Sequence, residues 1–206
     1  GHPKCAIKLL KPLDTRPEVL EAAKKLFDRE AQTLYKLGKH NQIPSLLAHF
    51  EQGAEFYLAQ EFIEGQVLSA EIQPGTKLSE SYVIQMLEDL LQILDFVHRE
   101  GVIHRDIKPA NLIRRFSDDR LVLIDFGAVK EASIQRLDPQ GHTCSTIAVG
   151  TYGYMPNEQA NGRPKFASDI YAAGMLAIQA LTGISPNQLP EDYETGEAVW
   201  RDRASS

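Results

Sequence analysis

Four side chains that can bind metal or transfer protons lie close together in the middle of the chain. Asp106, Lys108 and Asn111 fall within one short run, HRDIKPAN, and Asp125 follows after one predicted hairpin. Asn111 and Asp125 offer the amide and carboxylate oxygens that Mg²⁺ prefers, so they could share one metal and phosphate site. Asp106 could then accept the proton of a hydroxyl, and Lys108 could supply positive charge to a phosphoryl group.

The elements around these residues predict that they meet in space. Short apolar runs at Leu112–Ile113 and Leu121–Ile124 flank a polar turn, Ser117–Asp119, which is the pattern of a small hairpin. The HRDIKPAN run precedes the first strand, and the Asp125-Phe126-Gly127 triplet follows the second. The two motifs therefore stand at the two ends of the hairpin sequence and come together in space.

Lys8 stands alone in an otherwise apolar run, Cys5–Leu10, whose alternation is that of a β-strand. One interpretation is an edge strand whose lysine extends into water, and the other is a lysine directed into a cleft. The next predicted helix favours the cleft, because Glu30 falls on its apolar stripe between Phe27 and Leu34. A buried carboxylate is costly unless it is paired, and Lys8 is the nearby candidate partner.

The other predicted elements follow from helix caps, glycines and apolar periodicity. In chain order they are a helix from Pro17 to Gly38, a hairpin of Leu46–Phe50 and Phe56–Gln60, a hinge at Glu61–Gly65, a helix from its cap Ser79 to about Glu100, and a helix over Asp169–Thr182 capped by Ser168. The last helix is apolar on nearly all sides, which predicts that it is buried. Residues 127–150 predict a long surface loop, and no firm element is predicted after Gly183. Strands give way to helices near residue 64, where we place a boundary between two lobes.

The composition limits the class of protein. The 206 residues, 43% of them hydrophobic, suit one globular domain or two small lobes. The net charge of −6 disfavours nucleic acid as a partner, because phosphate binding needs a basic face. The two cysteines, Cys5 and Cys144, lack metal-ligand spacing and predict no disulfide framework, which favours a reducing, cytoplasmic setting. No apolar run is long enough for a membrane helix, so we expect no membrane contact from this segment and any tether outside it.

Seven motifs occur in the order and at the spacing of one enzyme family. They are AIK (6–8), DREA (28–31), EFIEG (61–65), HRDIKPAN (104–111), DFG (125–127), GTYGYMPNE (150–158) and SDIYAAG (168–174). Over roughly residues 4–185 the chain thus resembles the eukaryotic-like, or Hanks-type, serine/threonine protein kinases of bacteria. The resemblance implies a bilobal α+β fold, with a partial N-lobe of a small antiparallel sheet and one helix at 1–63 and a mainly helical C-lobe at 64–206.

The resemblance also implies an ATP site with Mg²⁺ or Mn²⁺ as its cation. Lys8 would bind the α- and β-phosphates and pair with Glu30, while Asn111 and Asp125 would hold the metal. The residues assigned to the adenine end are the backbone of Glu61 and Ile63, the gatekeeper Gln60, and Ile113.

Asp106 would orient and deprotonate the acceptor hydroxyl, and Lys108 would steady the transferred phosphoryl group. A lysine two residues after this aspartate is typical of kinases that act on Ser and Thr, rather than on Tyr or on small molecules. Thr151, in the substrate-binding turn, indicates the same class. The expected reaction is therefore transfer of the ATP γ-phosphate to Ser or Thr hydroxyls of a protein substrate.

The family further suggests control by phosphorylation of the activation segment. Arg105, joined by a basic residue such as Lys130, would receive the phosphate. The candidate acceptors are Thr143, Ser145 and Thr146. For each of them, the alternative is a hydroxyl that simply belongs to a polar loop. A homodimer would permit autophosphorylation between two copies.

Five residues have structural roles in the family. Asp169 resembles the buried acid that ties down the catalytic loop from below, although an acid at a helix N-terminus is the plain alternative. His104, Leu34, Leu46 and Phe126 would stack as the series of side chains that registers the active state. The alternative for these four side chains is ordinary core packing, which makes the same physical claim about their contacts.

Two departures from the family pattern affect the expected activity. No glycine-rich strand-loop-strand precedes Lys8, and the usual Ala-Pro-Glu reads Pro156-Asn157-Glu158. The usual arginine partner of Glu158 belongs to a later region, so we expect a truncated domain without the lid over the phosphates or the last helices. The alternative is a non-catalytic nucleotide-binding or scaffold pseudokinase, yet no catalytic residue is substituted. The sequence leaves open whether Lys8 and Glu30 are paired or the helix is swung out.

Overall fold

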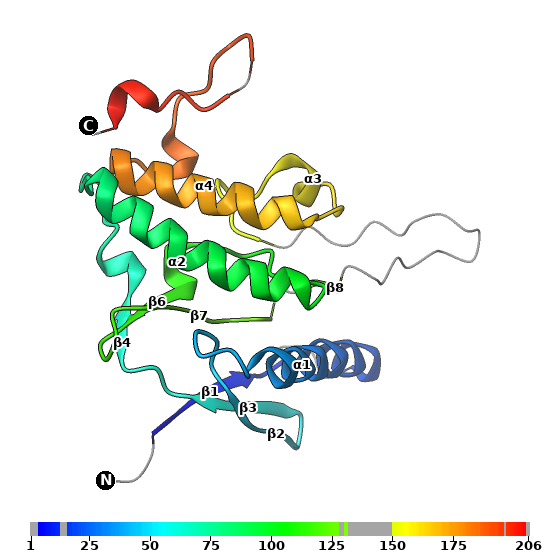
Figure 1. Ribbon diagram of the computed structural model, residues 1–206. Helices are drawn as coiled ribbons and strands as arrows, with labels where there is room; N and C mark the ends of the chain where they lie inside the picture. The colour runs from blue at the N-terminus through cyan, green and yellow to red at the C-terminus, as the bar shows by residue number, and fades with distance from the viewer. Residues whose placement is uncertain (1–3, 13–15, 128–129, 132–149, 196, 205–206) are drawn as a thin grey trace.

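The computed structural model of this chain describes residues 4–12, 16–127, 130–131, 150–195 and 197–204. A sheet with one helix lies near the N-terminus, and a mainly helical part contains the C-terminus (Figure 1). Helices and antiparallel strands are both present, so the predicted α+β class is confirmed.

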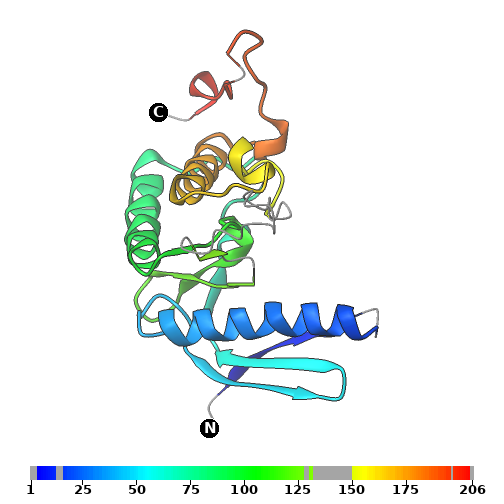
Figure 2. The ribbon, with the colours of Figure 1, turned by 90° about the vertical axis from the view of Figure 1, so that its right-hand side faces the viewer.

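The N-terminal part is a three-stranded antiparallel sheet. Its strands are β1 (Cys5–Leu10), β2 (Leu46–Gln52) and β3 (Glu55–Glu61), in the order β1-β3-β2. The predicted hairpin is formed by β2 and β3, and its turn passes through Gly53 at a φ of 65°, a left-handed conformation that glycine adopts readily. Helix α1 (Pro17–Leu37) lies between this sheet and the helical part (Figure 2).

Helix α1 has the predicted limits and the predicted buried stripe. Pro17 occupies the first turn, where its missing N–H is not needed, and Gly38 is the C-terminal cap. Phe27 and Leu34 are buried, and Glu30 between them is only 8% exposed. The carboxylate therefore lies on the buried face, where it needs a partner.

The helical part is built on two long helices that pack side by side, α2 (Glu80–Arg99) and α4 (Phe166–Thr182). Their apolar residues and the buried stripe of α1 belong to one hydrophobic cluster, so both parts share a core. Helix α2 begins as predicted, because the Ser79 hydroxyl accepts the Tyr82 N–H. The short helices are α3 (Asn157–Ala160) and the 3₁₀ turns η1 (Leu68–Ala70), η2 (Pro109–Asn111), η3 (Pro186–Gln188) and η4 (Arg201–Arg203).

Two predictions about α4 are wrong. The helix begins at Phe166, because Ser168 acts from inside the first turn, where its hydroxyl accepts the Lys165 N–H at 3.0 Å. It is also not buried on nearly all sides, since Ile170 is 45% exposed whereas Leu176 is fully buried. Hydrophobic composition alone does not show which face of a helix its neighbours cover.

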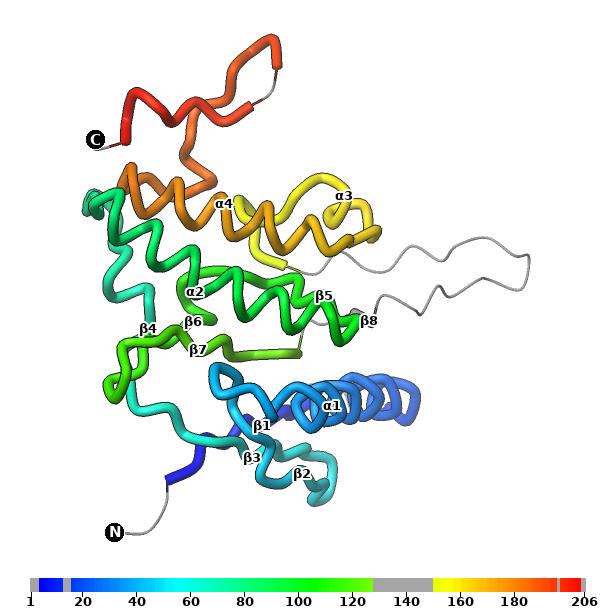
Figure 3. The backbone as a smooth tube through the Cα atoms, viewed as in Figure 1, coloured from blue at the N-terminus to red at the C-terminus, as the bar shows by residue number. Residues whose placement is uncertain are grey.

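Two small sheets carry the motifs that could do chemistry. Strands β4 (Gly65–Val67), β6 (Leu112–Arg115) and β7 (Leu121–Leu123) pair antiparallel in the order β4-β6-β7, and β5 (Val102–Ile103) pairs with β8 (Lys130–Glu131). The predicted hairpin is β6–β7, and β7 passes between α1 and α2 (Figure 3). Beyond its end the Ile124 N–H donates to the Asn111 carbonyl at 2.9 Å. The HRDIKPAN run and the 125–127 triplet therefore meet, as predicted.

Gln42 joins the two parts through buried hydrogen bonds. Its amide nitrogen donates to Asp89 of α2 at 2.9 Å and to the Leu121 carbonyl at 2.8 Å. The backbone carbonyl of Gln42 accepts the Leu123 N–H at 2.9 Å. Gln42 lies in the loop after α1, so these bonds fix the end of that helix against the strand that leads to Asp125.

Other expectations concern the loop and the tail. Most of the predicted loop 127–150 lies outside the described residues, although its start contributes β8. After Gly183, the described residues form only η3, η4 and one bridge between Glu191 and Ala198. No helix in the described part of the chain has the length and apolar character needed to cross a bilayer.

Leu90→Ala should lower the free energy of unfolding by about 2–5 kcal/mol, the usual cost of emptying a buried leucine site. Leu90 is fully buried in α2, whereas its neighbour Leu91 is 40% exposed. Leu91→Ala is therefore the matched control and should cost much less. Urea unfolding followed by circular dichroism measures both variants, and equal losses would contradict the packing of α2.

Candidate active site

A buried carboxylate from α4 holds the backbone of the HRDIKPAN run. Asp169 is 1% exposed, and its two oxygens accept the His104 N–H at 2.9 Å and the Arg105 N–H at 2.8 Å. His98 of α2 reaches the first of these oxygens at 2.8 Å. Arg105 is held at a φ of 71°, which residues other than glycine rarely adopt. Asp169 thus lies where the buried acid was predicted, and also in the first turn of its helix, where the helix dipole favours it.

The Asp106 carboxylate is the centre of a hydrogen-bonded cluster. It accepts the Thr151 hydroxyl at 2.6 Å and lies 2.8 Å from the Lys108 amine. The Asn111 amide nitrogen donates to this carboxylate at 2.9 Å and to the Asp106 carbonyl at 2.8 Å. Lys108 also donates to the Thr151 hydroxyl at 2.9 Å. Four residues singled out in the sequence therefore share one site.

Lys8 joins the carboxylates of two different elements. Its amine lies 2.8 Å from Glu30 of α1 and 2.6 Å from Asp125, which follows β7. Gly127 permits this approach, since a Cβ there would lie 3.0 Å from the Lys8 amine and 3.1 Å from a Glu30 oxygen. The structure therefore pairs Lys8 with Glu30, and of the two interpretations of Lys8 it favours the inward-facing one.

The three charged groups of this cluster titrate differently. Burial raises the pKa of Glu30, and the charge and hydrogen bond of Lys8 only partly offset it. Burial acts on Asp125 as well, but the Lys8 hydrogen bond and charge and the Gly127 N–H prevail and lower its pKa. Burial by itself would lower the pKa of Lys8, yet the two carboxylates raise it. Glu30 is therefore the first of the two carboxylates to be neutralised on acidification.

The side chains predicted to stack lie in one continuous core. His104 is fully buried, and burial lowers the pKa of its imidazole, so the ring is neutral at pH 7. Its ring meets Phe126 edge-on, with the centroids 5.0 Å apart. Phe126 and Leu34 belong to the same cluster, and Leu46 packs against it. The core thus links the catalytic loop to α1 and β2.

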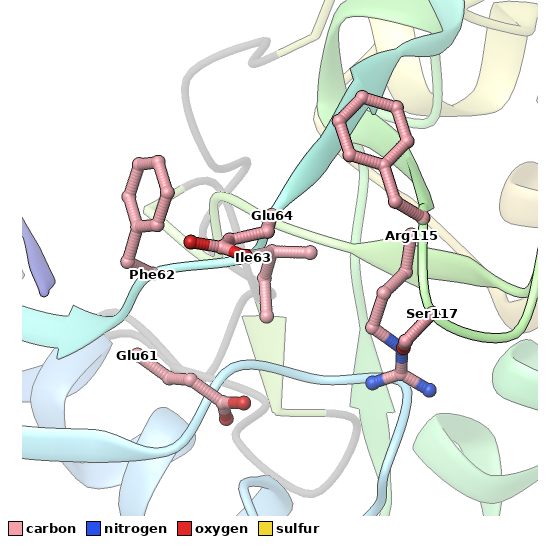
Figure 4. Close-up of a pocket in the computed structure, with 7 residues that line it drawn as sticks. Glu61, Phe62, Ile63, Glu64, Arg115 and Ser117 are labelled. Carbon is pink, nitrogen blue, oxygen red and sulfur yellow. The ribbon is translucent and has the colours of Figure 1, made fainter. Parts of the chain in front are cut away.

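The hinge residues line a cavity. Residues 61–64 form one side of a pocket of about 340 Å³, and the β6–β7 turn at 115–117 forms the other (Figure 4). The Glu61 N–H donates to the Ser45 carbonyl at 2.9 Å. Neither Lys8 nor Asp106 lines this pocket, so it is separate from the two charged clusters.

The other two residues predicted at the adenine end lie on strands beside the hinge. Gln60 is in β3, opposite Ala6 of β1, and Ile113 is in β6, opposite Val67 of β4. Both side chains are half-buried. They flank the hinge from the two parts of the molecule, one from each sheet.

The predicted phosphate receptor is described only in part. Arg105 is half-buried, and its pKa is lowered by burial and by the nearby charge of Arg29. Sequence reasoning missed Arg29, whose available signal was its position directly before Glu30 in α1. The backbone of Lys130 forms part of β8. The candidate acceptors that lie outside the described residues are Thr143, Ser145 and Thr146.

Glu158 has a partner on α4. It accepts the Ser168 hydroxyl at 2.8 Å, and Ser168 itself is fully buried. The turn that follows Thr151 is therefore tied to the same helix that supplies Asp169.

Comparison with known protein families identifies the family of the chain that carries these clusters. The family model described as the protein kinase domain matches residues 2–205. The chain belongs to the protein kinase family. Its bilobal α+β arrangement and its motifs are those expected from the resemblance.

Several curated bacterial kinases are similar to this kinase chain. Serine/threonine-protein kinase B of Synechocystis sp. is 47% identical over 203 residues, which cover 97% of this chain and 35% of that protein. Serine/threonine-protein kinase PknA of Nostoc sp. is 44% identical over 198 residues, covering 96% and 35%. Serine/threonine-protein kinase pkn3 of Myxococcus xanthus is 35% identical over 178 residues, covering 84% and 31%. The chain thus spans about a third of the length of these relatives.

The residues at the two charged clusters fit the cation that kinases use. The NH₂ group of Asn111 donates its hydrogen bonds to Asp106, so the amide oxygen is the atom that can bind a cation. Asp125 offers a partly exposed carboxylate of lowered pKa. One carboxylate and one amide oxygen, completed by phosphate oxygens and water, suit Mg²⁺. Within the described ranges, no three His, Cys, Asp or Glu residues form a metal site by themselves, so phosphate oxygens would complete the shell.

Lys8→Met should raise the pKa of Glu30 further in the metal-free protein. The change removes the charge and hydrogen bond that oppose the effect of burial, so the carboxyl stays protonated to higher pH. Because the pKa is raised in the folded state, the folded chain binds this proton more tightly than the unfolded chain. The unfavourable contribution of Glu30 to stability therefore grows as the pH rises through this pKa.

A ¹³C NMR titration of the Glu30 carboxyl measures this effect. Lys25→Met, which removes the exposed partner of Glu21, is the control and should leave the Glu30 midpoint unchanged. A midpoint that falls in Lys8→Met would show that Lys8 does not stabilise the charged form of Glu30.

Proposed function

We propose that this chain is the catalytic domain of a serine/threonine protein kinase, which transfers the γ-phosphate of ATP to Ser or Thr hydroxyls of protein substrates. The observation that carries the proposal is the Asp106 cluster, in which a carboxylate and an amine both bond to an aliphatic hydroxyl and an amide holds the carboxylate in place. The names of the bacterial relatives, all serine/threonine-protein kinases, support it.

Thr151 illustrates how the cluster treats an alcohol. Its hydroxyl donates to Asp106 at 2.6 Å and accepts from Lys108 at 2.9 Å. A substrate Ser or Thr hydroxyl in the same surroundings would find a proton acceptor on one side and positive charge on the other. The distance to Asp106 is within the range for general-base catalysis. Lys108 would offset the charge that develops on the transferred phosphoryl group.

Lys8, Glu30 and Asp125 would prepare the phosphate end of the site. Glu30 fixes the Lys8 amine from α1, so the amine can turn from Asp125 towards the α- and β-phosphates without losing its partner. Asn111 and Asp125 would hold Mg²⁺ or Mn²⁺, which when bound neutralises charge on the phosphates. The ion pairs thus keep a positive charge ready at the place where ATP would bring negative charge.

We place the adenine end at the hinge. Because the Glu61 N–H is already bonded to Ser45, the carbonyl of Glu61 is the group assigned to adenine, together with the backbone of Ile63. Gln60 would limit the depth of this end as the gatekeeper, and Ile113 of β6 would contact the base from the other part.

Control by phosphorylation of the activation segment is a second part of the proposal. Burial and then the nearby charge of Arg29 lower the pKa of Arg105, and a phosphate would relieve the repulsion between the two arginines. Lys130 would add a third charge, and the acceptor would be one of Thr143, Ser145 and Thr146. Autophosphorylation in a homodimer would supply the phosphate, and we propose a cytoplasmic setting in which the substrates are proteins.

Asp106→Asn should lower kcat for a Ser/Thr peptide by about 10²–10⁴-fold, because it removes the proton acceptor and keeps the size of the side chain. Asp95→Asn, in an exposed aspartate of α2, is the matched control and should keep the wild-type kcat. A peptide assay and the intact mass after incubation with Mg-ATP measure the effect.

The full-length protein gives the decisive comparison. Phosphate added to the wild type and mapped to Thr143, Ser145 or Thr146 would support control through the activation segment. Mg-dependent nucleotide binding with no transfer in the wild type would contradict the kinase proposal and favour the scaffold alternative.

A further inference from the structure

Gln159 is a buried polar side chain that the roles described above do not use. It lies in α3, directly after Glu158, and is 3% exposed. Its amide nitrogen donates to the Arg105 carbonyl at 2.6 Å. The residue that it holds is the one before Asp106, so Gln159 reaches the catalytic loop from the far end of the substrate-binding segment.

The Arg105 peptide groups are thereby held on both sides. Asp169 of α4 accepts the Arg105 N–H at 2.8 Å, and Gln159 of α3 donates to the Arg105 carbonyl. Arg105 sits at a φ of 71°, a conformation that persists only where the surroundings impose it. The carbonyl of Arg105 belongs to the same planar peptide as the Asp106 N–H. The direction of this carbonyl therefore helps to set the orientation of the Asp106 backbone, from which the side chain extends.

Gln159 also contacts the turn that carries Thr151. Gly150 has a φ of 141°, and a Cβ at this position would lie 2.5 Å from the Gln159 amide nitrogen and 2.8 Å from the Arg105 carbonyl oxygen. A side chain is therefore excluded where the glutamine, the catalytic loop and the turn meet. The next residue, Thr151, is the one that donates to Asp106.

We propose that Gln159 is a positioning residue for phosphoryl transfer, which clamps the Arg105–Asp106 peptide against the Gly150–Thr151 turn. The hydrogen bond to Arg105 fixes the loop, and the close contact with Gly150 fixes the turn. Asp106 and Thr151 are thereby kept within hydrogen-bonding distance of each other. This inference rests on the proposed kinase activity. Among the described residues, Gln159 is bonded to none of the side chains assigned to the reaction, and we propose that it acts through the two backbones.

Gln159→Met tests the clamp, because methionine is similar in length and cannot donate the hydrogen bond. In the full-length protein, kcat for a Ser/Thr peptide should fall about 10²-fold, as expected when a catalytic group is slightly misplaced. The KM for ATP should stay unchanged, since Lys8 and the hinge are untouched. Gln179→Met is the matched control: Gln179 is also buried and bonds to Tyr154, so its loss should lower stability and leave kcat near the wild-type value.

Hydrogen–deuterium exchange gives a second measurement that does not depend on activity. The amides of residues 104–106 should exchange faster in Gln159→Met than in the wild type, and not in Gln179→Met. Exchange at the wild-type rate, or a folded Gln159→Met protein with wild-type kcat, would overturn the proposal. Faster exchange in Gln159→Met, together with no transfer by the wild type, would uphold the clamp and refute the kinase activity.

Discussion

The catalytic loop depends on one buried carboxylate. Asp169 accepts the N–H groups of two successive residues, His104 and Arg105, and holds the second in a left-handed conformation. Such a conformation costs about 1–3 kcal/mol and persists only where the surroundings over-determine it. A buried carboxylate is itself costly, but here two backbone donors, His98 and the first turn of α4 compensate it. Because Asp106 follows directly, the direction of its side chain depends on this bond pair.

A second constraint couples the two parts of the molecule. The loop after α1 is fixed by the hydrogen bonds that Gln42 makes with the backbone of Leu121 and Leu123, which do not titrate, whereas the middle of α1 is held by the ion pair of Glu30 with Lys8. The raised pKa of Glu30 shows that its burial is only partly compensated. Protonation or a competing charge would therefore weaken the middle of α1 first and leave its end in place. The helix is thus positioned by one permanent and one titratable contact.

The sequence was most informative where a residue broke a local pattern. Glu30 on an apolar stripe and Lys8 in an apolar strand marked each other as candidate partners, because each was costly alone, although the sequence left open whether they are paired or the helix is swung out. Local signals such as Ser79 also predicted helix ends. The contacts of Gln42 and Gln159 were not predictable, because glutamine is usually exposed on a protein surface and only the packing of distant segments buries these two. The prediction that α4 is buried on nearly all sides, Ile170 included, was wrong for the same reason, because hydrophobicity does not reveal which neighbours cover a face.

Single-turnover phosphoryl transfer by Asp169→Asn, measured beside the wild type, tests most directly whether this carboxylate sets the active loop. Asparagine keeps the size of the side chain and one acceptor oxygen, but turns an NH₂ group towards a backbone N–H. The transfer rate should fall about 10²-fold or more, with the affinity for Mg-ADP unchanged. A folded Asp169→Asn protein that transfers phosphate at the wild-type rate would contradict the dependence of Asp106 on Asp169.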